Sequence, residues 1–291
     1  FAALDANTTA SNNTAVGYNS LTANTTGTRN TAVGTSAGTA ITTGGNNTVM
    51  GYNALATNTV GDRNVAIGEG ALQTHNPSSN ADTYNVAVGY DAGNAVTTAT
   101  HNTLIGALAG DSLTTGASNV AVGYGALTTD DVGQHNVAIG RDALSAQNIA
   151  SAANTYNTAV GSSAGAAVTT GTSNTLIGGL AGNANTTGGN NTFVGKSAGV
   201  ANTTASSNTF VGERAGTANT TGDESVAVGQ FAYSANTTGV DNVAIGRSAL
   251  AANTTAHNNV AIGRSALLSN TTGTRNASVG SVSLDANTTG D

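Results

Sequence analysis

The chain repeats one short pattern, in which an asparagine precedes a three-residue apolar stretch and a glycine ends it. Asn64-Val65-Ala66-Ile67-Gly68 is one copy of this pattern. Successive copies start 17 residues apart, except that the copies beginning at Asn64 and Asn136 are 21 residues long. A fixed period of this kind is typical of repeat architectures. The sixteen copies begin at Asn13, Asn30, Asn47, Asn64, Asn85, Asn102, Asn119, Asn136, Asn157, Asn174, Asn191, Asn208, Ser225, Asn242, Asn259 and Asn276.

A 17-residue unit cannot bury its apolar side alone, but stacked units bury it together. We therefore predict an all-β fold, a parallel β-solenoid or β-roll of about sixteen coils, with residues 1–12 as a partial coil. No composition shift divides the chain, which predicts one domain over residues 1–291. At about 4.8 Å per coil, the stack would be about 75–80 Å long. A helical repeat is the competing interpretation, but a glycine in every coil costs too much helix propensity.

Each coil is numbered here from position zero, its first asparagine. Alternation along the strand predicts that Val65 and Ile67, at positions one and three, form the interior and that Ala66 faces the other way. Gly68 at position four would end the strand. A second short strand is expected at the Ala-Leu or Ala-Gly pair of positions seven and eight. The Asn-Thr-Thr-Gly segment would then turn the chain back through left-handed backbone.

Stacking places identical side chains above one another, so we expect a ladder along the axis. Amides of the position-zero asparagines can hydrogen-bond from coil to coil, as stacked asparagines do in cross-β structures. The position-four glycines would form a parallel column beside them. The predicted ladder includes Asn64, Asn85, Asn102, Asn119 and Asn136, with Gly68, Gly89, Gly106, Gly123 and Gly140.

Positions two and eight exchange bulk. Ala66 occurs with Leu72, whereas Phe210 occurs with Gly216. Such a swap suggests that both positions share one packed space. Because positions one and three would already supply the interior, we expect this space to lie against a neighbouring chain.

Composition narrows the possible functions. Charged residues are 8% of the chain and the net charge is −7, so no basic cluster is available for nucleic acid. No apolar stretch is long enough to insert into a membrane, and cysteine is absent. The chain begins at Phe1 rather than at a methionine, which suggests a processed or excised piece.

Catalytic and metal-binding patterns are weak. Gly34-Thr35-Ser36-Ala37-Gly38 matches the G-x-S-x-G nucleophile motif, but the match recurs at Ser163 and Ser197 as a product of the period. His101 and His135 lie two coils apart, too far to share a metal ion, and all four histidines are expected to be solvated turn residues. We predict no enzyme activity, no cofactor and no metal site.

Four tyrosines share position five, just after the glycine: Tyr18, Tyr52, Tyr90 and Tyr124. An exposed aromatic column can bind a glycan or a protein. Shielding of the bend is the alternative interpretation.

The two long coils insert four residues each, within 73–84 and 145–156. These insertions are expected to protrude from one edge, either as binding loops or as clasps against a partner chain. The candidate loop residues are His75, Asn76, Pro77, Tyr84, Asn148, Ile149 and Tyr156.

The segments 64–68, 242–246 and 225–229 resemble the head repeats of YadA-like trimeric autotransporter adhesins. The segment 13–27 is similar to repeats in phage and viral tail fibres. The resemblance implies a left-handed β-roll, a homo-oligomer such as a trimer, and attachment to a host surface protein, matrix or glycan. It also implies an extracellular, cell-surface or virion-surface location.

Three functions remain open on the sequence. The first is an extracellular adhesin or fibre-head module. The second is a structural subunit that assembles end to end or laterally into a filament, since both chain ends stop within a repeat. The third is ice binding, suggested by the Thr-Thr pairs such as Thr25-Thr26, although adjacent threonines would leave only a single file facing outward.

Overall fold

The computed structural model describes residues 2–290, and within that range every regular element is a short strand and no helix occurs. The prediction of an all-β, parallel β-solenoid with sixteen coils about 17 residues apart is confirmed. The chain forms two compact units. Unit 1 holds residues up to Asp142 together with Asn148–Asn154, and unit 2 holds Ala143–Gln147 together with the residues from Thr155 onward.

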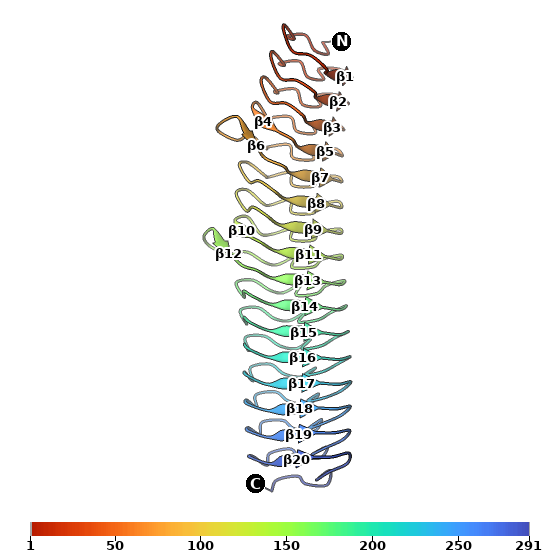
Figure 1. The fold of residues 1–291 in the computed structure, drawn as a ribbon, viewed down its shortest axis with the longest axis vertical. Helices are drawn as coiled ribbons and strands as arrows, with labels where there is room; N and C mark the ends of the chain where they lie inside the picture. The colour runs from red at the N-terminus through yellow and green to blue at the C-terminus, as the bar shows by residue number, and fades with distance from the viewer. Residues whose placement is uncertain (1, 291) are drawn as a thin grey trace. The chain divides into compact units, whose positions relative to one another are not determined.

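Unit 1 stacks eight three-residue strands in chain order, each pairing in parallel with the next (Figure 1). These strands are β1 (Thr14–Val16), β2 (Thr31–Val33), β3 (Thr48–Met50), β5 (Val65–Ile67), β7 (Val86–Val88), β8 (Thr103–Ile105), β9 (Val120–Val122) and β11 (Val137–Ile139). Two further parallel pairs join β4 (Gly61–Asp62) to β6 (Ala81–Asp82) and β10 (Gly133–Gln134) to β12 (Ala153–Asn154).

Unit 2 also stacks eight parallel strands in chain order. They are β13 (Thr158–Val160), β14 (Thr175–Ile177), β15 (Thr192–Val194), β16 (Thr209–Val211), β17 (Val226–Val228), β18 (Val243–Ile245), β19 (Val260–Ile262) and β20 (Ala277–Val279). The register places equal repeat positions opposite each other, as Phe193 pairs with Phe210.

The strands turn the opposite face inward from the one that the sequence suggested. Ala66 and its counterpart Ala87 are fully buried, whereas Val65 and Ile67 are only half-buried on the outer face. The alternation was predicted correctly, but its direction was wrong. Position two shares its side of the strand with the position-zero asparagine, and Asn64 is buried because it hydrogen-bonds inside the coil. Position two therefore faces the interior as well.

The predicted second strand at positions seven and eight does not form. Those residues lie in a run of turns, and Leu72 has a left-handed φ of 48°. Left-handed backbone recurs at positions six, eight and sixteen, as at Asp91 and Arg63. The Asn-Thr-Thr-Gly segment, where we expected it, is not left-handed. Its glycine is needed for another reason, since a Cβ on Gly27 would overlap the carbonyl oxygen of Gly44 in the next coil.

Positions two and eight form the core itself, rather than a contact with another chain. A Cβ on Gly110 would lie 2.8 Å from Cδ2 of Leu104, so the small residue makes room for the large one. In unit 2 the rings of Phe193 and Phe210 stack with centroids 5.0 Å apart. Tyr233, at position eight, is fully buried beside them and donates a hydrogen bond to the Gly239 carbonyl oxygen at 2.9 Å.

Candidate binding surfaces

The outer face of each parallel sheet carries two uncharged rows. Position one is threonine, valine or, once, alanine, and position three is valine, isoleucine or, once, methionine. In unit 1, Met50, Ile105 and Ile139 are 37–42% exposed, and in unit 2, Ile177 and Ile245 are each 38% exposed. We name these rows the outer sheet face.

The tyrosine column of unit 1 is exposed throughout, with Tyr18, Tyr52, Tyr90 and Tyr124 between 54% and 59% accessible. Each tyrosine lies one residue beyond the glycine that ends its strand. The carbonyl oxygen of each tyrosine accepts a hydrogen bond from the position-six amide of the next coil, as Tyr18 does from Ser36 at 2.9 Å and Tyr52 does from Gly70 at 3.0 Å. The column therefore stands on a continuous backbone ladder, and intervening coils separate its members.

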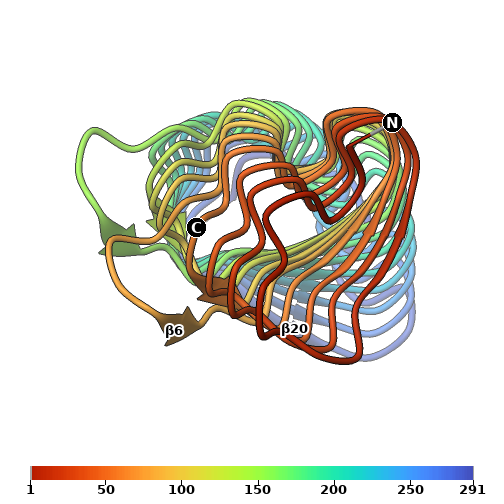
Figure 2. The ribbon, with the colours of Figure 1, turned by 90° about the horizontal axis from the view of Figure 1, so that it is seen from above.

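The insertions of the two long coils project on the same side of unit 1, at β6 and β12 (Figures 1 and 2). Of the predicted loop residues, Asn76 and Asn148 are exposed, although Asn76 still pairs with the next coil, because its amide donates to the Thr97 carbonyl oxygen at 2.8 Å. Three predicted loop residues point inward instead. His75 and Pro77 are buried, and Ile149 is 8% exposed, so these side chains close the coil interior beneath the loop.

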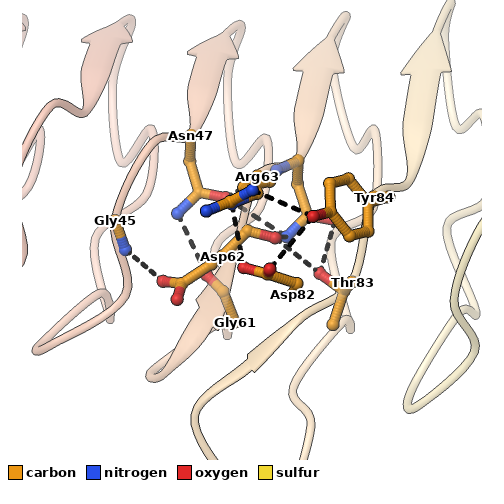
Figure 3. A network of polar contacts seen from close by, with 9 residues as sticks. Gly45, Asn47, Gly61, Asp62, Arg63, Asp82, Thr83 and Tyr84 are labelled. Atoms are coloured by element: carbon orange, nitrogen blue, oxygen red, sulfur yellow. Dashed lines mark hydrogen bonds and ion pairs between the residues drawn. The ribbon is translucent and has the colours of Figure 1, made fainter.

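Tyr84 fastens the first insertion to the preceding coil of its own chain (Figure 3). Its hydroxyl accepts a hydrogen bond from Arg63 Nη1 at 2.9 Å and donates one to Asp82 Oδ2 at 3.0 Å. Arg63 Nε also pairs with Asp82 Oδ1 at 2.9 Å. Below the ring, the Thr83 hydroxyl bonds the Asn64 side-chain oxygen at 2.8 Å. These contacts make the first insertion an intramolecular clasp.

Tyr156 occupies the corresponding place in the second long coil and is 55% exposed. It belongs to unit 2, whereas Asn148 and Ile149 belong to unit 1.

Position-zero asparagines form the interior ladder. The side-chain oxygen of Asn64 accepts from the Asn85 amide at 3.2 Å, that of Asn85 from Asn102 at 3.1 Å, and that of Asn102 from Asn119 at 2.9 Å. The Asn136 amide donates in the same way to Asn119 at 2.9 Å. Outside the two long coils, the side-chain amide nitrogen also donates to a carbonyl oxygen at position fourteen, as Asn102 donates to Gly116 at 2.9 Å.

A second ladder runs along position eleven, and sequence reasoning missed it. Asn202 donates to Asn185 at 2.9 Å and Asn219 donates to Asn202 at 3.0 Å through side-chain amides. Asn253 continues the ladder by donating to Asn236 at 3.1 Å. The signal that could have found it is the asparagine of the Asn-Thr-Thr-Gly segment, which we interpreted only as a turn residue.

Beside this ladder, the position-twelve threonines hydrogen-bond within the stack: the Thr186 hydroxyl donates to the Thr203 carbonyl oxygen at 3.1 Å. Only the position-thirteen threonines, such as Thr187, are exposed. The Thr-Thr pairs thus present a single file.

The expectation that all histidines are solvated is wrong for His75. This side chain is 0% exposed, and neither ring nitrogen has a hydrogen-bond partner among the described residues. Burial lowers the pKa of His75 to about 4. It occupies position eleven of the first long coil, where most coils have asparagine. His101 and His135 are exposed, and His257 is half-buried.

The serine motifs lie in the left-handed turns that follow the strands, where Ser36, Ser163 and Ser197 have φ values of 54–57°. No helix follows any of them within residues 2–290. Over the same residues, no three His, Cys, Asp or Glu side chains are placed to hold a metal ion together.

None of the described residues belongs to a helix that is long and apolar enough to span a bilayer. In comparisons with known proteins, no family model and no curated protein matches this chain.

Proposed function

We propose that this chain is a module of an extracellular adhesin or fibre head, and that its copies associate side by side through the outer sheet face. The observation that carries the proposal is the pair of uncharged rows at positions one and three. Ile105 and Ile139 in unit 1, and Ile245 and Ile262 in unit 2, are exposed members of the second row.

Parallel sheets are rarely left with one face in water. They occur almost only where both faces are covered, and their strands are rich in valine and isoleucine for that reason. Here the inner face packs on Ala66 and its counterparts, while Val65 and Ile67 have no covering element within the unit. The position-three row is a contiguous line of exposed or half-buried apolar side chains, and an exposed apolar surface usually marks an interaction site. A second copy presents the same rows with the same coil spacing, so two faces can pack in register.

The location and the attachment role are supported by the resemblance of the 64–68, 225–229 and 242–246 segments to adhesin head repeats. A stacked scaffold also suits that role, because it holds surface columns at fixed spacing. A filament that grows along the coil axis is the alternative form of assembly, and it uses the ends of the stack rather than the outer sheet face.

Light scattering after size-exclusion chromatography tests the association. The wild-type chain should have the mass of an oligomer, and the double variant Val122→Lys with Ile139→Lys should be monomeric with an unchanged circular dichroism spectrum. The matched control places the same charges on exposed threonines of position thirteen, Thr26→Lys with Thr43→Lys, and should remain oligomeric. A wild-type chain that is monomeric at every concentration would overturn the proposal, and continuous axial fibres in electron micrographs would favour the filament.

A further inference from the structure

The tyrosine column of unit 1 has a period of its own, twice that of the coils. Tyr18, Tyr52, Tyr90 and Tyr124 occupy position five of every second coil. The coils between them carry smaller or flexible residues at that position, namely Thr35, Glu69 and Ala107. At about 4.8 Å per coil, neighbouring tyrosines are about 9.6 Å apart and the column is about 29 Å long.

The backbone beneath the column is fixed. Position-six amides bind the position-five carbonyl oxygens of the adjacent coils, with distances of 2.9 Å from Leu108 to Tyr90 and 3.1 Å from Gly125 to Ala107. The heights at which the four exposed side chains leave the backbone are therefore set before any ligand arrives. Tyrosine has few rotatable bonds and loses little conformational entropy on binding, which makes it effective on binding surfaces.

Polar groups accompany the rings. Asn19, Asn53 and Asp91 directly follow three of the four tyrosines and are half-buried. The hydrogen bond with the Asp91 carboxylate raises the pKa of Tyr90, so its hydroxyl stays protonated as a donor. Aromatic faces beside amide and carboxylate groups suit a ligand that has flat apolar ring faces and many hydroxyls at their edges.

The charge near the column argues against an acidic ligand. Arg141, at position five of the coil that follows Tyr124, already pairs with Asp142 at 3.0 Å. Glu69 lies between Tyr52 and Tyr90 and would repel a sulfate or carboxylate.

We infer that the tyrosine column binds an extended, neutral, β-1,4-linked polysaccharide lying along the coil axis. In such a chain every second sugar presents the same face, and a disaccharide is about as long as two coils. Each tyrosine would stack on one sugar of each disaccharide. The inference names a ligand for the proposed adhesin role and rests on it for its biological meaning, but it uses a different surface.

Isothermal titration with cellohexaose and chitohexaose tests the inference, with the disaccharides cellobiose and chitobiose as length controls. A hexasaccharide reaches three successive tyrosines when they stack on alternate sugars, so one of the two should bind at least about tenfold more tightly than its disaccharide, because several rings act together. The double variant Tyr52→Ala with Tyr90→Ala should lose at least about tenfold in affinity. Tyr156→Ala, which removes an exposed tyrosine outside the column, should bind as the wild type does.

A composition-matched variant tests the spacing itself. Thr35→Tyr with Tyr52→Thr keeps four tyrosines in the same column but moves one by a single coil. Both residues already occur at position five, so folding should be unaffected. We expect at least about fivefold weaker hexasaccharide binding, since one ring leaves the disaccharide register.

Equal binding by wild type and the shifted variant would overturn the inference, as would no binding of either hexasaccharide. Binding of decaproline without binding of the sugars would also overturn it, in favour of a polyproline peptide, whose turn of about 9.3 Å has a similar spacing. Light scattering on the same samples separates the two proposals. A wild type that is oligomeric but binds neither hexasaccharide counts against the column alone, and a wild type that is monomeric counts against the outer sheet face.

Discussion

Phe210 and Gly216 occupy one space inside unit 2. A Cβ on Gly216 would overlap the Phe210 ring, and its backbone has a φ of 58°, in the left-handed region. Several coils with alanine at position two fill the same space from position eight, as Leu250 does beside Ala244, and both residues there are fully buried. Three other coils have glycine at position eight and fill the space from position eleven, with the buried residues Ile41, Val96 and Val168. The exchange of bulk between positions two and eight is therefore a property of the core.

We predict strong coupling between these two positions. Phe210→Ala should lower the free energy of unfolding by about 3–5 kcal/mol, because it leaves a cavity. Gly216→Leu alone should also destabilise, because the site is already filled. The double variant recreates the Ala-Leu pair of the coil at Asn242, so its loss should be at least about 2 kcal/mol smaller than the sum of the single losses. Denaturant unfolding measures all three, and additive losses would contradict the shared space.

The position-zero ladder yields a second prediction. Asn208 accepts from the Ser225 amide at 3.0 Å and donates to the Gly222 carbonyl at 2.9 Å. Asn208→Ala leaves the Ser225 amide and the Gly222 carbonyl without these partners, so the free energy of unfolding should fall by about 2–4 kcal/mol.

Asn208→Ser is the matched variant, because serine occupies the same column naturally at Ser225, where its hydroxyl accepts from the Asn242 amide at 3.2 Å. It should lose clearly less stability than the alanine variant in thermal unfolding. Equal losses would mean that the side-chain oxygen contributes nothing to stacking.

The sequence was sufficient to predict the coil, its period and the parallel stacking, because the Asn-x-x-x-Gly pattern recurs in fifteen of the sixteen copies and position four is glycine in all of them. It was misleading about the inside. Val65 and Ile67 are larger and more apolar than Ala66, and size suggested that they fill the core. The buried asparagine sets the direction instead. Because Asn64 hydrogen-bonds inside the coil, it fixes which side of the strand faces inward.

Surface residues could be predicted from the sequence only where their position in the repeat determines their exposure. The tyrosine column is such a case, because its members share one repeat position. The inward orientation of His75 was missed because position eleven, which it shares with buried asparagines such as Asn58 and Asn185, was interpreted as a solvated turn position. The clasp, which joins Arg63 to Tyr84 across 21 residues, could not be predicted in this way.

The contacts of Tyr84 predict that its loss changes local opening of the first insertion but not the overall stability of the fold. Tyr84→Phe removes both hydroxyl hydrogen bonds at an exposed site, so the free energy of unfolding should change by less than about 1 kcal/mol. The Thr83 amide, which donates to the Asp62 carbonyl oxygen at 3.1 Å, should exchange its hydrogen up to about fivefold faster as the insertion opens. Hydrogen exchange checks this, with Tyr124→Phe as a control at a distant exposed tyrosine. Unchanged exchange at Thr83 would show that the backbone pairing of β4 and β6 is enough.

The buried imidazole of His75 predicts an acid-sensitive step in stability. Burial lowers its pKa to about 4 in the folded chain, whereas an unfolded histidine has a pKa of about 6.5. Above about pH 6.5 the ring is neutral in both states and has no pH-dependent effect. As the pH falls from about 6.5 to about 4, His75 binds a proton in the unfolded state but not in the folded state. The free energy of unfolding therefore decreases by about 3 kcal/mol in total.

A matched variant isolates this histidine from the carboxylates that titrate in the same range. Gln147 occupies position eleven of the second long coil, where its side chain contacts Thr155 at 3.3 Å and Asn157 at 2.9 Å. Thr83 and Asn85 stand at the corresponding places around His75, so His75→Gln supplies an uncharged side chain with available partners. Denaturant unfolding at pH 7.5 and pH 4.5 should show a smaller loss on acidification in the variant than in the wild type. The difference should approach about 3 kcal/mol, since the glutamine cannot bind the proton. If both proteins lose the same stability, the ring is not held neutral by the fold.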